Sequence, residues 1–213
     1  LLVVYRSPLL PVIVLISSMV ALSGAIFVIW HMANAGWVMI NGQVQGILLI
    51  LVVGAATDYS LLYVARYREA LTQYTCRWQA TRAAWRGSLE PILASGGTVI
   101  VGLLCLLLSE LSSNKALGPV AATGIVLSML ASLTFLPAAL ALLGRAAFWP
   151  ARPHYSSEIK DASAGFWAKI AAFVSGRPRT VWLVTALVLA IFAGFSGTFQ
   201  ANGVRQSDLV LGE

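Results

Sequence analysis

Charged residues are scarce in this sequence. Asp, Glu, Lys and Arg make up 10% of its 213 residues, whereas 59% are hydrophobic. A soluble domain carries about 25% charged residues, so the composition excludes an ordinary water-soluble fold. Cysteine and histidine are rare as well, with two of each. Neither pair has the spacing of a zinc site or of a disulfide framework, so we expect no metal and no other cofactor.

The sequence contains long runs of apolar residues instead. Each run approaches or exceeds the roughly 20 residues that a membrane-spanning helix needs. None alternates in the manner of a barrel strand, and a helix satisfies its backbone hydrogen bonds internally. The sequence therefore predicts an all-α transmembrane bundle with five spanning helices, over Pro8–Trp30, Val44–Ala65, Pro91–Ser109, Leu117–Leu143 and Thr180–Phe199.

Lysine and arginine are distributed unevenly over the segments that flank these helices. If the helices alternate in direction, twelve of the 14 basic residues lie on one side, and two, Lys115 and Arg205, lie on the other. This asymmetry predicts that the basic side is cytoplasmic. It also accounts for the net charge of +6 without a nucleic-acid partner, because basic flanks are attracted to the anionic surface of the lipid bilayer.

Two long connections lie on the basic side. The segment Arg66–Glu90 is expected to be a helical loop, with Ser88 as the cap of a helix that enters at Glu90–Pro91. The segment 144–179 begins as a linker and ends in an amphipathic pattern, which favours a helix on the inner membrane surface. A cytoplasmic extension of the fifth helix is the alternative. The apolar face of this pattern comprises Phe166, Trp167, Ile170, Phe173 and Val174.

Pro137 interrupts the fourth apolar run. Because proline lacks a backbone donor, we expect a kink or a break in that helix. Ser132, Leu133 and Thr134 lie in the turn before the proline and could take up the freed backbone groups.

An aspartate lies inside the second apolar run. Asp58 precedes Arg66 by eight residues, which places it about 12 Å deeper at roughly 1.5 Å per residue. Half of the hydrocarbon core is about 15 Å thick, so Asp58 lies close to the membrane midplane. An ionised carboxylate there costs about 2.5–3.5 kcal/mol. A carboxyl that is neutral in one conformation and charged in another can carry a proton across the membrane.

A structural role for Asp58 is the alternative, in which it is a polar residue that hydrogen-bonds neighbouring helices together. Gly54, one turn earlier, fits both roles because it lets a partner helix approach. Thr57 and Tyr59 are the nearest hydrogen-bonding groups. Tyr63 and Tyr67 are expected in the aromatic belt at the interface. No basic side chain lies at the depth of Asp58.

Several motifs resemble a known family. "GAATDY", at residues 54–59, matches the Gly-x-x-x-Asp-Tyr motif of the MMPL family, a branch of the RND superfamily of proton-driven exporters. The resemblance continues through "RYRE", "ASGGTVIVGLLCLL" and "LTFLPAALALLGR" and covers nearly the whole chain. The order of these segments makes the match more specific than the six-residue motif alone.

The resemblance implies a larger architecture. MMPL transporters have twelve spanning helices in two repeats, with large extracytoplasmic domains after the first and the seventh. The five helices here resemble the third to the seventh, so we expect a fragment. Its expected parts are a transmembrane block (1–143), the linker with its interfacial helix (144–179), a spanning helix (180–200) and the start of an extracytoplasmic domain (201–213).

The resemblance also implies a site and a function. Asp58 and Tyr59 match the family's proton-relay pair, which faces an equivalent Asp-Tyr pair on the tenth helix, here in the missing C-terminal half. Gly54, Ser95 and Thr98 are candidate neighbours of the relay. The implied function is proton-coupled export of lipids or other hydrophobic compounds across the bacterial inner (cytoplasmic) membrane, without enzymatic activity. Self-association into a homo-oligomer is left open.

Two other classes of protein remain as alternatives. A non-transporting lipid-binding module, similar to a sterol-sensing domain, could use the same helices, but it would not need a titrating acid at the midplane. An intramembrane protease would need two deep aspartates or a serine–histidine pair. The sequence offers one deep aspartate, and His31 and His154 lie outside the apolar runs.

Overall fold

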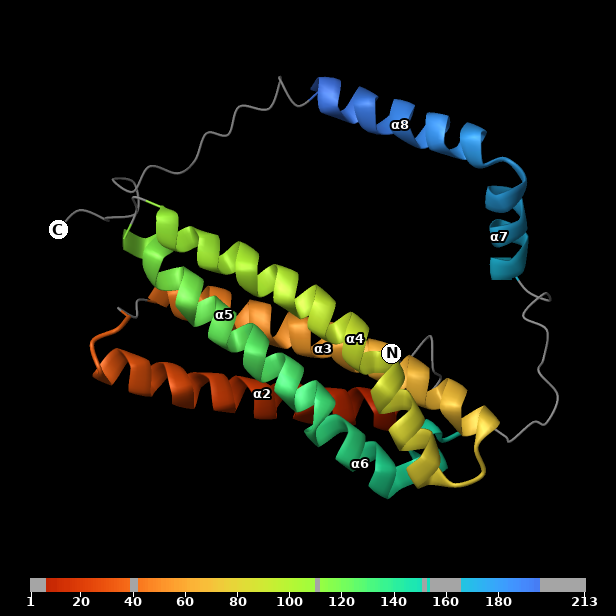
Figure 1. Ribbon diagram of the computed structural model, residues 1–213, viewed down its shortest axis with the longest axis horizontal. Helices are drawn as coiled ribbons and strands as arrows, with labels where there is room; N and C mark the ends of the chain where they lie inside the picture. Colours follow the sequence, from red (N-terminus) through yellow and green to blue (C-terminus); the bar gives the residue numbers. More distant parts are fainter. Residues whose placement is uncertain (1–6, 39–41, 110–111, 151–152, 154–165, 196–213) are drawn as a thin grey trace. The chain divides into compact units, whose positions relative to one another are not determined.

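The computed structural model describes residues 7–38, 42–109, 112–150, 153 and 166–195 (Figure 1). Every regular element in these residues is a helix. In chain order the elements are α2 (Leu9–Asn34), α3 (Gly42–Gln73), α4 (Arg77–Leu104), η1 (Cys105–Leu108), α5 (Ser112–Leu133), α6 (Phe135–Leu143), η2 (Gly144–Phe148), α7 (Phe166–Gly176) and α8 (Pro178–Phe195).

Five segments of the described chain are long and apolar enough to cross a membrane, which confirms the predicted all-α transmembrane bundle. They begin and end within a few residues of the predicted runs, except that several extend further on the basic side. The five segments are Leu9–Asn34, Gly42–Gln73, Arg77–Leu108, Asn114–Phe148 and Pro178–Phe195.

Helices α2 to α6 belong to one compact unit, and α7 and α8 belong to another. In the first unit, α2 to α5 lie side by side, and α3 packs against α2, α4 and α5 (Figure 1). We call the end of this four-helix block that holds Leu9, Gln73, Arg77 and Arg145 the basic end, and the end that holds Asn34 and the start of α3 the opposite end.

The connection predicted over Arg66–Glu90 differs from the expectation. Helix α3 continues to Gln73, and α4 begins at Arg77, so all but three residues of this segment extend two spanning helices. Ser88 is not a cap, because α4 runs through Pro91 without a break. Membrane helices tolerate an internal proline where neighbouring groups satisfy the freed backbone, and sequence alone does not reveal those neighbours.

The fourth spanning segment is broken, as predicted from Pro137. Helix α5 ends at Leu133, Thr134 has a non-helical conformation (φ −120°, ψ −65°), and α6 begins at the next residue. The carbonyl of Leu133 loses its donor, since Pro137 has no N–H. The indole N–H of Trp85, on α4, donates to this carbonyl at 3.0 Å. A neighbouring helix, rather than the turn itself, therefore satisfies the group.

Three hydrophobic clusters make up the core of the four-helix block, and two of them lie towards its ends. The basic-end cluster includes Tyr63, Tyr67, Leu136 and Phe148. The opposite-end cluster includes small and branched residues of α2 and α3, such as Ala25 and Val52.

Helices α7 and α8 are separated only by Arg177. The predicted amphipathic segment is helical, and Ile170, Phe173 and Val174 are exposed within this unit. Its position at the membrane surface stays a prediction. The extracytoplasmic segment predicted at 201–213 lies outside the described residues.

Candidate functional site

Asp58 lies at the midpoint of α3, on a side of the helix that no other helix of the same compact unit covers. Ile50, Gly54, Asp58 and Leu62 are one turn apart, so they form one stripe along this side. All four are exposed in the described part of the chain. The carboxylate therefore projects from an apolar surface instead of being enclosed by the block.

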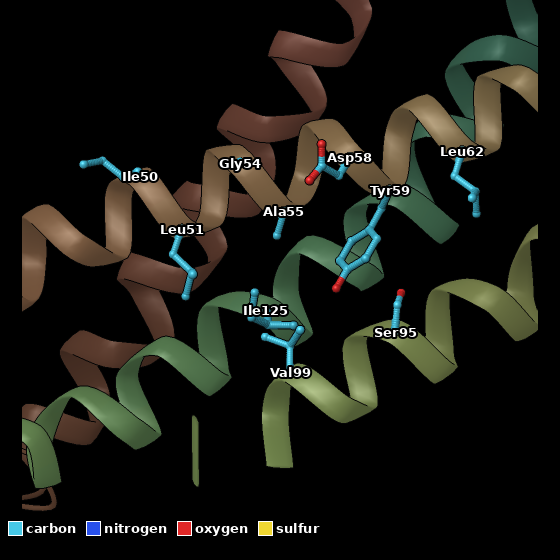
Figure 2. Close-up of a pocket in the computed structure, with 10 residues that line it drawn as sticks. All are labelled: Ile50, Leu51, Gly54, Ala55, Asp58, Tyr59, Leu62, Ser95, Val99 and Ile125. Atoms are coloured by element: carbon cyan, nitrogen blue, oxygen red, sulfur yellow. The ribbon is translucent and has the colours of Figure 1, made fainter. Parts of the chain in front are cut away.

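A pocket of about 560 Å³ opens in front of this stripe (Figure 2). Most of its walls are apolar, and its polar groups are a carboxyl and two hydroxyls. Residues from α3, α4 and α5 line it: Ile50, Leu51, Gly54, Ala55, Asp58, Tyr59, Leu62, Ser95, Val99 and Ile125.

The carboxylate of Asp58 has no hydrogen-bond donor and no cation partner among the described residues. The preceding hydroxyl does not supply one, because Thr57 donates to the carbonyls of Val53 and Gly54 at 2.8 and 2.7 Å. An unpaired carboxylate beside apolar side chains is costly to bury while it is charged.

Tyr59 occupies the adjacent side of α3 and is buried in a small cluster with Ile92, Ile125 and Met129. Its ring points towards α4, and its hydroxyl lies on the side of Ser95 (Figure 2). The Ser95 hydroxyl also lies 3.3 Å from the carbonyl of Ile92. The structure thus brings together Asp58, Tyr59 and Ser95 from two helices.

Of the other two candidate neighbours of the relay, Gly54 lines the pocket and Thr98 does not. Gly54 lines the pocket, and a Cβ atom added there would meet no atom within 4 Å. No other helix of the same compact unit approaches it that closely, so the space beside Gly54 is open within this unit. Thr98 does not line this pocket; its hydroxyl donates to the carbonyl of Ser95 at 2.7 Å, and its side chain is exposed.

The interfacial role expected for Tyr63 and Tyr67 is wrong. Both side chains are fully buried, and their hydroxyls donate to the carbonyls of Thr81 and Leu140, at 3.4 and 3.0 Å. They connect α3 to α4 and α6 inside the core. Their spacing from Tyr59 suggested a single surface, but α4 and α6 cover this part of the helix.

The sequence analysis missed the apolar wall of the pocket. The i, i+4 spacing that links Ile50 and Leu62 to Asp58 could have revealed the part on α3. Val99 and Ile125 carry no such signal, because their positions depend on how α4 and α5 pack against α3. The site is thus a carboxyl beside a tyrosine and a serine at the edge of a mostly apolar pocket.

The chain is similar in sequence to known membrane proteins. Residues 1–181 match the model of the MMPL family. A membrane protein of Streptomyces coelicolor is 46% identical over 100% of this chain, which covers 30% of that protein. The apo-petrobactin exporter of Bacillus anthracis is 30% identical over 92% of this chain and 28% of its own length. The sulfolipid-1 exporter MmpL8 of Mycobacterium tuberculosis is 30% identical over 95% of this chain and 18% of its own length.

The chain therefore spans less than a third of the length of these relatives. The family match covers most of its residues, including the pocket and all the helices of the four-helix block. The protein is a membrane protein, and its chain belongs to the MMPL family.

Proposed function

We propose that this chain is part of the proton-translocating region of an exporter of lipids or other hydrophobic compounds in the bacterial cytoplasmic membrane. The observation that carries the proposal is the position of Asp58. It is a carboxyl without a partner in the described chain, at the middle of a spanning helix and at the edge of an apolar pocket. Acidic residues at such a depth are retained mainly for function.

The pocket supports a relay in which Asp58 gains and loses a proton while Tyr59 and Ser95 fix the local hydrogen bonds. The open side of Gly54 supports a partner segment outside this chain, which would bring a second Asp-Tyr pair to the pocket. Protonation removes the charge of Asp58 and lowers the cost of burying it under that segment. Proton uptake would in this way be coupled to closure of the pocket.

The class of cargo follows from the relatives. Two of them are named as exporters of sulfolipid-1 and of apo-petrobactin. We extend export of a lipid or other hydrophobic compound to the whole protein that contains this chain. We infer a transport role rather than an enzymatic one, because the relatives are named as exporters.

Asp58→Asn in the full-length protein tests the proposal. The substitution keeps the size and hydrogen-bonding ability of the side chain but removes its titration, so we expect proton-gradient-dependent export to fall to background. Membrane abundance should stay near normal. Glu69→Gln is the matched control, because it removes an acid that lies outside the pocket and pairs with Arg66 at 3.3 Å.

A non-transporting lipid-binding module is the second candidate function, favoured by the mostly apolar lining of the pocket. Binding of a lipid in this pocket would not require titration of Asp58. If Asp58→Asn exports normally at normal abundance, the relay is excluded. If the unsubstituted protein binds lipid without exporting it, and Asp58→Asn binds lipid equally well, the lipid-binding function is the better account.

A further inference from the structure

We propose that the first turns of α4 bind the headgroup of an anionic phospholipid between two tryptophans, and that an acyl chain of this lipid follows the same side of the helix. We call the residues that carry this proposal the basic–aromatic face; they are Trp78, Arg82, Trp85 and Arg86. None of them lines the pocket at Asp58, and the site does not depend on the proposed function.

The basic–aromatic face lies along one side of α4. Trp78, Arg82 and Trp85 are four and three residues apart, so they are neighbours on the helix surface, and Arg86 follows Arg82 by one turn. All four are exposed in the described chain, Trp78 by 57% and Trp85 by 38%. Helix α4 packs against α3, α5 and α6, and its buried residues in these turns lie on the other side. The face is thus open within the four-helix block.

The polar groups of this face are available to a ligand. Arg82 and Arg86 make no hydrogen bond and no ion pair with any described residue, and the same holds for the indole N–H of Trp78. Glu90, one turn after Arg86, does not pair with it in the described chain either. Guanidinium groups bind phosphate oxygens through strong, charge-assisted hydrogen bonds. Two free guanidinium groups and a free indole donor therefore suit a lipid phosphate.

Both tryptophans are held in place before any lipid binds. The guanidinium carbon of Arg77 lies 5.4 Å from the ring centroid of Trp78, and an N–H of the same arginine donates to the carbonyl of Leu142 at 3.1 Å. The indole N–H of Trp85 donates to the carbonyl of Leu133 at 3.0 Å. Because these contacts fix the two rings, a headgroup that binds between them loses little binding free energy to their ordering.

The depth of this face matches one leaflet of a bilayer. Arg66 ends the apolar run of α3, and a Cβ atom added at Gly87 would lie 4.0 Å from the Cδ atom of Arg66. Gly87 therefore marks the edge of the hydrocarbon on α4. At roughly 1.5 Å per residue, Arg82 lies about 8 Å beyond this edge and Leu93 about 9 Å inside it. The headgroup layer is about 5–8 Å thick, which places Arg82 at headgroup depth.

Apolar side chains continue the face towards the middle of the membrane. Leu89 and Leu93 follow Trp85 at intervals of one turn, and Leu93 is 49% exposed. Tryptophan is enriched at the level between headgroups and hydrocarbon, where its ring is apolar and its N–H is polar. The order of cation, indole and leucine along one side of α4 is thus the order of phosphate, glycerol and acyl chain in a phospholipid.

The charge of the face selects an anionic lipid over a zwitterionic one. A zwitterionic headgroup would bring its own ammonium group close to the two free guanidinium groups, whereas phosphatidylglycerol carries only the negative phosphate. Each basic residue near an anionic membrane surface contributes enough free energy to change binding about fivefold. Loss of both arginines should therefore have a larger effect than loss of one.

Native mass spectrometry of the purified full-length protein tests the site, in micelles with equal amounts of phosphatidylglycerol and phosphatidylcholine of the same acyl chains. We expect the unsubstituted protein to retain phosphatidylglycerol preferentially. Arg82→Gln with Arg86→Gln should lower its affinity about fivefold for each arginine. Arg66→Gln with Arg68→Gln is the matched control, because it removes the same charge from α3 at the same end and should change the affinity much less.

Two outcomes of this experiment would overturn the proposal. Equal losses for the two pairs of substitutions would show that the lipid is attracted by the total charge of the basic end and not by a site on α4. Absence of any preference for phosphatidylglycerol in the unsubstituted protein would show that the face binds no anionic lipid, as when another part of the full-length protein covers it.

Trp78→Ala provides a second test that leaves the net charge unchanged. It removes a free N–H donor and one of the two rings, so phosphatidylglycerol retention should fall. Trp37→Ala, which removes a tryptophan that is 77% exposed beyond the other end of α2, should leave retention unchanged. Equal retention by Trp78→Ala and the unsubstituted protein would exclude a headgroup between Trp78 and Trp85, and this result stands even if the double arginine variant does not fold.

Discussion

The two halves of the four-helix block are held together in different ways. In the basic half, side chains donate hydrogen bonds to backbone carbonyls of other elements. The donors are Ser7, Tyr63, Tyr67, Arg77, Trp85 and Arg145. In the opposite half, glycines allow close helix contacts: a Cβ atom added at Gly118 would lie 2.8 Å from the carbonyl oxygen of Leu103.

The difference shows how a membrane helix bundle divides its interactions. Close contact through small residues suits the part within the hydrocarbon, where burial of apolar surface gives no advantage over lipid. Long polar side chains are useful where helix ends leave carbonyls without amide donors. Asp58 lies between these two regions, with the bonded half on one side of it and the tightly packed half on the other.

Arg145→Ala should have the largest effect on stability, because Arg145 caps the end of α3. Its guanidinium donates to the carbonyls of Leu71, Tyr74 and Thr75, at 2.8, 2.9 and 3.1 Å. We expect the free energy of unfolding to fall by about 3 kcal/mol, since hydrogen bonds from a charged group are lost and the carbonyls stay unpaired. Denaturant unfolding measures the change.

Arg77→Ala is the control for that experiment, because Arg77 makes a single such bond, to the carbonyl of Leu142 at 3.1 Å. It should cost about 1 kcal/mol. Equal losses for Arg77→Ala and Arg145→Ala would contradict the capping role, and the basic half would then not be distinguished by its polar bonds.

Gly118→Ala should have an intermediate effect, confined to the opposite half. The added methyl group meets a backbone oxygen that cannot move independently, so we expect a loss of about 1–3 kcal/mol. Gly54→Ala is the matched variant, because nothing lies within 4 Å of its Cβ position. In the isolated block it should stabilise α3 by about 0.5–1 kcal/mol. Thermal unfolding of both variants should give shifts of opposite sign; a destabilised Gly54→Ala block would show that this side of α3 is not open.

The smallest expected effect concerns the reactivity of Cys76, just before α4. The backbone N–H groups of Gln79 and Trp78 lower the pKa of the Cys76 thiol, so its thiolate persists at lower pH than usual. We expect alkylation by a maleimide to slow less between about pH 8 and pH 6.5 than for an ordinary thiol of pKa about 8.5. Cys105→Ser removes the other thiol.

Thr75→Cys, in a chain that also carries Cys76→Ser and Cys105→Ser, supplies the reference thiol at the neighbouring exposed position. If alkylation of both thiols slows equally as the pH falls, the helix start has no influence on the reactivity of Cys76.

Labelling of intact cells with an impermeant reagent tests whether the basic end is cytoplasmic, because Cys76 should then be protected.

The helices and the position of Asp58 inside a spanning helix could be predicted because both depend on local sequence: run length, basic flanks and spacing along one helix. The break at Thr134 was also local, since Pro137 removes a donor wherever it lies. The burial of Tyr67 could not be predicted, because it depends on α6 packing over α3. The prediction of Ser88 as a helix cap was wrong for a related reason. Only the neighbouring helices distinguish a proline that starts a helix from one inside it. The roles of Asp58 and Tyr59 stay predictions, and Asp58→Asn tests the first of them.

The hydrogen bond between Trp85 and Leu133 bears on the order of biosynthesis. The carbonyl that Pro137 leaves open is satisfied by a residue made 48 positions earlier in the chain. When the broken segment enters the membrane, the helix that carries its donor has already been synthesised. The segment can thus exchange water for an indole N–H as it docks, so its insertion need not wait for anything made later.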